Sequence, residues 1–187
     1  MRDLLRRVQE ALPEMARWID RLHAQHAAQA VSVREAAPAR LAGYFPPALL
    51  DSARVVTGEA LPFPPVAEYG LPEFAGMATP DMAGITFGPM YFVRAEDPAG
   101  GVHFHELVHV VQWKTLGVAG FLSTYAVGLA QHSYETSPLE SIAFWLEGQF
   151  ALGIAPFEVS EFVAQHARAA RDAAAQVFQK HHLQLGA

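Results

Sequence analysis

The segment His105-Glu106-Leu107-Val108-His109 contains the residues of this chain that are best suited to chemistry. Residues four apart on an α-helix lie above one another on one face, so His105 and His109 can bind the same metal ion. Glu106 follows the first histidine, and its carboxylate can reach a water molecule beside the metal. We therefore predict a zinc site with His105 and His109 as ligands and Glu106 as the general base.

The residues around this motif predict a buried helix. Apolar side chains flank the motif on both sides, and the only polar stripe is made by the two histidines and Gln112. The apolar positions are Val102, Phe104, Leu107, Val108, Val110, Val111, Trp113 and Leu116. The Gly100-Gly101 pair is typical of an entry loop, and Gly117 of a C-cap. We expect Gln112 to hydrogen-bond within the cleft or to be a buried structural amide.

A catalytic zinc ion commonly has three protein ligands, which leaves one position for water. We choose Glu140 as the third ligand because it lies in the first turn of a helix that Ser137 and Pro138 begin. In an alternative arrangement, a capping box, Glu140 turns back to the N–H of Ser137. The other candidate ligands are Glu135, Glu147 and His132. Glu147 is also suited to accept a hydrogen bond from a ligand histidine.

If the predicted zinc site and its general base hydrolyse peptide bonds, the oxyanion that develops needs a further hydrogen-bond donor. This donor is commonly a tyrosine or a histidine. The candidates in the right region of the sequence are Tyr134, Tyr125 and His132. The sequence does not decide among them, and Tyr134 is our working assignment beside Glu106.

The composition is that of one globular domain. The 187 residues are 51% hydrophobic and 17% charged. We divide them into an N-terminal helical segment (1–37), a core (38–152) and a C-terminal helix (153–187). Because the chain has no cysteine, a metal must be held by histidine and carboxylate side chains.

Charge and hydropathy exclude several partners. The net charge is −6 and no run of basic residues stands out, so nucleic acid is not an expected partner. The N-terminal apolar residues are interleaved with charged ones, which predicts neither a signal peptide nor membrane insertion. We expect a cytoplasmic protein, with signal-independent export left open. The oligomeric state is not predicted.

Helical periodicity predicts an amphipathic helix over about 4–22, which Pro13 either kinks or divides into two. We expect His23 and His26 at its end to be solvated. Further helices are expected over about 121–129, 138–152 and 159–183.

Two stretches predict strands. Residues 53–57 read as one strand, and residues 84–93 as a bulged edge strand or a two-strand ribbon that turns at Gly88-Pro89. An edge strand beside a cleft can bind an extended peptide through main-chain hydrogen bonds. The alternative is an ordinary edge strand that its proline protects.

The motif and its downstream glutamate resemble a known family. The HELVH segment followed by Glu140-Ser141-Ile142-Ala143 resembles the gluzincin pattern. The longer string 105–112, preceded by 84–88, is similar to the minigluzincins and to related small bacterial metallopeptidase-like domains. The similarity covers about residues 83–150.

This resemblance implies an α+β, zincin-like fold. Such a fold has a small mixed sheet with an edge strand over the cleft, an active-site helix and a glutamate helix, here with extra helices at both termini. It also implies that zinc is bound by His105, His109 and Glu140, and that the substrate is a protein or peptide. Terminal segments that cover the cleft, and so inhibit the enzyme, are a further hypothesis.

Two other functions compete with a zinc endopeptidase. In one, zinc only holds two helices together in a binding or structural domain. In the other, the chain is a helical interaction protein without metal, and HELVH is an ordinary helix face. Metal analysis separates the metal-free interaction protein from the two zinc-binding candidates. A cleavage assay separates the endopeptidase from the structural zinc domain.

Overall fold

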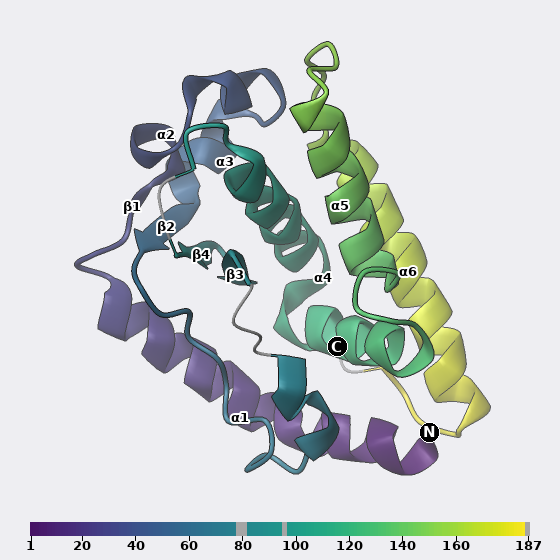
Figure 1. The fold of residues 1–187 in the computed structure, drawn as a ribbon. Helices are drawn as coiled ribbons and strands as arrows, with labels where there is room; N and C mark the ends of the chain where they lie inside the picture. The colour runs from purple at the N-terminus through teal and green to yellow at the C-terminus, as the bar shows by residue number, and fades with distance from the viewer. Residues whose placement is uncertain (78–81, 95–96, 186–187) are drawn as a thin grey trace.

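A computed structural model describes residues 1–77, 82–94 and 97–185 of the chain. Helices surround a small sheet, and the long helix α4 (Gly101–Gln131) runs through the middle of the molecule (Figure 1). Helix α1 (Arg2–His26) lies on one side, and α5 (Pro138–Ala151) and α6 (Ser160–Lys180) lie side by side on the other. The predicted α+β class is confirmed.

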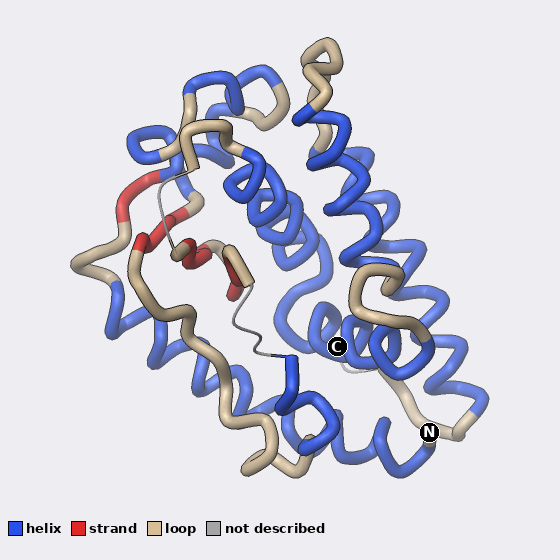
Figure 2. The backbone as a smooth tube through the Cα atoms, in the orientation of Figure 1, coloured by secondary structure: helices blue, strands red, loops and turns tan. Residues whose placement is uncertain are grey.

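The sheet is mixed and has four short strands among the described residues (Figure 2). They are β1 (Val31–Ser32), β2 (Arg54–Thr57), β3 (Gly84–Phe87) and β4 (Met90–Val93), in the order β1-β2-β4-β3. Strands β2 and β4 are parallel, whereas the other two pairs are antiparallel. Strands β3 and β4 form the predicted two-strand ribbon, which turns at Gly88 with φ of 63°. This leaves β3 at the edge.

The N-terminal segment differs from its prediction in three respects. Helix α1 continues through Pro13, so the proline does not begin a second helix. Strand β1 pairs with β2, although residues 1–37 were expected to be helical. The ring of His23 is half-buried, and its Nε2 lies 2.8 Å from the carbonyl oxygen of Phe87. The expectation that His23 is solvated is therefore wrong, because α1 packs close enough to β3 for this contact.

Helix α4 is buried over its first half, as the sequence predicts. Every residue from His103 to Trp113 is buried. At Gly117 the backbone leaves helical geometry, with φ of 69° and ψ of 174°, and the chain then continues as a second helical stretch to Gln131. Glycine adopts this left-handed φ without steric cost, so it ends the motif-bearing part of the helix where the sequence placed a C-cap.

The core packs the sheet against α4, α5 and the start of α6. Its members include Val55, Tyr91, Phe104, Leu146 and Val163. Short helices α2 (Val33–Ala36) and α3 (Pro47–Ser52) and the 3₁₀ helices η1 (Ala39–Gly43) and η2 (Pro72–Met77) complete the fold. Within the described ranges, none of the helices is long and apolar enough to cross a bilayer.

Candidate metal centre

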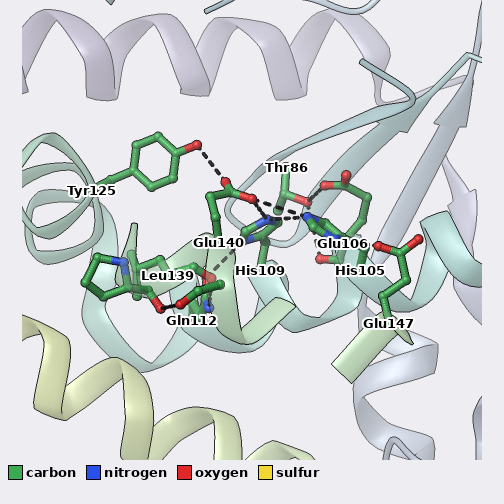
Figure 3. A network of polar contacts seen from close by, with 11 residues as sticks. Thr86, His105, Glu106, His109, Gln112, Tyr125, Leu139, Glu140 and Glu147 are labelled. Atoms are coloured by element: carbon green, nitrogen blue, oxygen red, sulfur yellow. Dashed lines mark hydrogen bonds and ion pairs between the residues drawn. The ribbon is translucent and has the colours of Figure 1, made fainter. Parts of the chain in front are cut away.

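Two helices bring the three predicted ligands together (Figure 3). His105 and His109 lie on consecutive turns of α4, and their Nε2 atoms are 3.0 Å apart. Glu140, in the first turn of α5, places its Oε2 atom 3.4 Å from each Nε2. With zinc–ligand bonds near 2.0–2.1 Å and tetrahedral angles, neighbouring ligand atoms are about 3.3 Å apart. The three atoms therefore have the separations that a tetrahedral zinc ion requires.

Hydrogen bonds on the far side of each imidazole set its tautomer. His105 donates from Nδ1 to Glu147 Oε2 at 3.0 Å, and His109 donates from Nδ1 to Gln112 Oε1 at 2.8 Å. The amide of Gln112 is oriented in turn, because its Nε2 donates to the carbonyl oxygen of Leu139 at 2.8 Å. Protons on both Nδ1 atoms leave the Nε2 lone pairs available to a metal ion.

Glu140, the third candidate ligand, is buried, and one of its two carboxylate oxygens is left without a hydrogen bond among the described residues. Glu140 is only 2% exposed, and its Oε1 accepts a hydrogen bond from the hydroxyl of Tyr125 at 2.6 Å. Its Oε2 has no hydrogen-bond partner among the described residues. The alternative capping box is not formed, since the side chain of Ser137 makes no cap hydrogen bond and Glu140 faces the histidines.

Three buried acceptor atoms this close to one another are stabilised when a cation lies between them. Burial alone would lower the pKa of His105, but the carboxylates of Glu140 and Glu147 outweigh it and raise the pKa to about 10. Burial would likewise raise the pKa of Glu140, but attraction to the imidazoles of His109 and His105, each 3.4 Å away, brings it well below its usual value. The burial, the spacing and the donor types of His105, His109 and Glu140 fit a divalent metal ion.

Glu106 lies beside the ligands without joining them. It is 4% exposed, and its Oε2 accepts a hydrogen bond from Thr86 Oγ1 of strand β3 at 2.6 Å. The backbone of Gly84 passes so close that a Cβ atom there would lie 2.5 Å from Glu106 Oε1. Burial raises the pKa of Glu106, although the histidines and Thr86 oppose the shift. A carboxylate with a raised pKa is a stronger proton acceptor, which suits a general base.

The predicted tyrosine lies at the edge of this group. Tyr134 lines the same cavity as Glu106, His109 and Glu140, and its side chain remains partly exposed. Burial and the two nearby carboxylates raise its pKa, so the phenol keeps its proton at neutral pH and can donate a hydrogen bond. The Tyr125 hydroxyl is already engaged by Glu140.

The reserve candidates separate into two groups. His132 and Glu135 are exposed and lie outside the ligand cluster. Glu147 makes the predicted hydrogen bond to a candidate ligand, His105. The contacts of Thr86 and Gly84 with Glu106 were not predicted from the sequence. They depend on how closely β3 approaches α4, and the sequence contains no signal for that distance.

No known protein family, curated protein or solved structure matches the chain. The function has to be inferred from the residues of the site.

Proposed function

We propose that the chain is a zinc-dependent metallopeptidase. The observation that carries this proposal is the convergence of His105, His109 and Glu140 on one point, with the carboxylate of Glu106 beside them. Two histidines one turn apart, a glutamate from a second helix and an adjacent acid are the ligand and base set of a zinc peptidase. The expected substrate is a protein or peptide.

The proposal includes a zincin-like arrangement of the elements. Helix α4 contributes the two histidines and the acid, and α5 contributes the third ligand. Strand β3 lies at the sheet edge and contacts Glu106 through Thr86. An edge strand next to the reacting groups can align an extended substrate through main-chain hydrogen bonds. These features support the gluzincin-like assignment.

The zinc ion, Glu106 and Tyr134 would each have a separate role in the proposed hydrolysis. A bound zinc ion would polarise the scissile carbonyl and lower the pKa of a water molecule to about 7. Glu106 would accept the proton of the attacking water on its carboxylate and deliver it to the leaving amine. Tyr134 would donate a hydrogen bond to the oxygen of the cleaved carbonyl group, where negative charge develops.

The test is the substitution Glu106→Gln, which keeps the size of the side chain and its hydrogen bond to Thr86 but removes the base. We expect about one zinc per chain in both proteins, measured by elemental analysis. Cleavage of an unfolded protein should fall by at least about 10²-fold in the variant, since general-base catalysis contributes 10²–10⁴-fold. Proteolysis that survives the substitution would overturn the catalytic assignment.

A non-catalytic zinc domain is the second candidate, and the burial of the site favours it. His105, His109 and Glu140 are 7%, 6% and 2% exposed, as expected of a structural metal site. In that case the protein would bind zinc, gain stability from it and cleave nothing. The presence of Glu106 in the cavity favours the enzyme, because three protein ligands leave one position open beside it.

A further inference from the structure

The metal centre opens into a cavity of about 140 Å³. Its polar lining comes from the metal centre and its neighbours, including Glu106, His109 and Glu140. The rest is almost entirely apolar and comes from α1, from residues 63–77, from β3 and from the second half of α4. The cavity thus joins one reactive polar end to a larger apolar space.

The apolar part of this cavity is not filled by the chain itself. Several of its lining side chains are large and apolar but only half-buried, and among them are Leu12, Phe63, Phe74, Leu122 and Leu129. These residues lie on three segments that are far apart in the sequence. Covering such open apolar surface with an apolar group lowers the free energy.

Size and polarity restrict what can enter. An apolar cavity of about 150 Å³ holds a molecule the size of benzene. The space here therefore suits one aromatic or branched aliphatic side chain, such as that of phenylalanine or leucine. A charged side chain would lose its hydration without gaining a partner in the apolar part.

We infer that this cavity is a specificity pocket that receives one bulky apolar side chain of the substrate, next to the bond that is cleaved. This inference rests on the proposed peptidase function. The walls from α1 and residues 63–77 lie outside the part of the chain that resembles gluzincins. The pocket is therefore a property of this chain's own N-terminal region.

Binding of toluene tests the pocket without any catalysis. Toluene should raise the melting temperature of the full-length protein, with or without zinc. Ala126 lines the pocket from α4, so Ala126→Leu should fill it and abolish the effect. Ala130→Leu is the matched control, because Ala130 is exposed on the same helix and does not line the pocket. No toluene effect in the unaltered protein, or an equal effect in Ala126→Leu, would overturn the pocket.

Should Ala126→Leu fail to fold, Leu12→Ala provides the second test. Leu12 is half-buried on α1 and lines the pocket, so its truncation enlarges the space. The toluene effect should persist in this variant, and a larger probe, naphthalene, should give a greater rise in melting temperature than in the unaltered protein. Equal responses of the two proteins to naphthalene would contradict the assignment.

Cleavage of a synthetic peptide library by the zinc-loaded protein is the second measurement. Leucine, phenylalanine, isoleucine or methionine should be enriched at one fixed position next to the cleaved bond. Replacing that residue by alanine should lower kcat/KM about 50-fold, from the loss of roughly three buried carbons. Cleavage without this preference would refute the pocket and leave the peptidase. Toluene binding without any cleavage would refute the peptidase and leave an apolar binding site.

Discussion

Gln112 connects the two halves of the candidate metal centre through one side chain. Its amide oxygen accepts a hydrogen bond from His109, and its amide nitrogen donates to the carbonyl of Leu139, the residue before Glu140. It is fully buried, and both of its polar atoms have partners. One residue thereby fixes the tautomer of His109, a proposed ligand, and holds the first turn of α5 against α4.

Replacing Gln112 by methionine should weaken zinc binding about 10- to 100-fold, the usual effect of losing a hydrogen-bond partner of a metal ligand. The measurement is competition with a chromophoric chelator. Gln112→Glu separates the two contacts, since a carboxylate can accept from His109 but cannot donate to Leu139. Its zinc affinity should lie between those of the parent and Gln112→Met. Unchanged affinity in Gln112→Met would show that the amide does not position the ligands.

Glycine is required at position 84 because β3 passes close to Glu106, the proposed base. A methyl group at this position would meet the Glu106 carboxylate at 2.5 Å, so Gly84→Ala should displace that carboxylate. We expect kcat to fall at least about tenfold while zinc content stays the same, because a base must lie within hydrogen-bond reach of its proton. Gly58→Ala is the control, since a Cβ there meets no described atom within 4 Å. Equal kcat in the two variants would contradict this reading of Gly84.

At the scale of elements, Pro13 is the feature of α1 that costs stability. It is exposed and lies inside the helix, where it cannot donate the backbone hydrogen bond of that turn. Pro13→Ala should raise the free energy of unfolding by about 2 kcal/mol, the helix-interior cost of proline less its effect on the unfolded chain. Urea denaturation measures the change.

Proline at the first position of a helix provides the comparison. Pro47 begins α3, where its missing N–H would have no helical partner, so Pro47→Ala should give no gain. A loss of stability in Pro13→Ala would mean that the proline shapes α1 for its packing, which has a stabilising effect larger than its cost.

The sequence predicts most elements because their signals are local. Apolar spacing identifies α1 and α4, Ser137-Pro138 identifies the start of α5, and Gly88-Pro89 identifies the turn between β3 and β4. Strand β1 was missed because it has only two residues and depends on pairing with β2. Two residues are too few to show an alternating pattern, so only the tertiary structure reveals such a strand.

The three candidate ligands could be predicted from the sequence for the same reason, because their signals are local. His105 and His109 are fixed by one helical turn, and Glu140 by its place at the start of the next helix. The contact of Thr86 with Glu106 and that of His23 with Phe87 join elements distant in the chain. Such contacts depend on how helices and sheet pack together, which no spacing along the sequence encodes.

At the scale of the whole molecule, the two terminal helices have different relations to the site. Helix α1 contributes walls to the cavity beside the metal centre, whereas no described residue of α6 lines it. Helix α6 instead buries Val163, Ala167 and Phe178 completely in the core. Its removal should expose this core and lower activity, so an inhibitory role fits α6 poorly. The cavity walls make α1 the better candidate for controlling access.

Zinc should stabilise the entire fold, because its proposed ligands join α4 to α5 across the centre of the molecule. Zinc at a free concentration of 100 times its Kd adds about 2.7 kcal/mol to the free energy of unfolding. For a chain of this size that raises the melting temperature by roughly 5–10 °C. Calorimetric melting with zinc and with EDTA measures this difference. Glu106→Gln should keep the zinc-dependent rise, since Glu106 does not join the ligand cluster. Glu140→Ala should lose it, and a full rise in that variant would show that zinc is bound elsewhere.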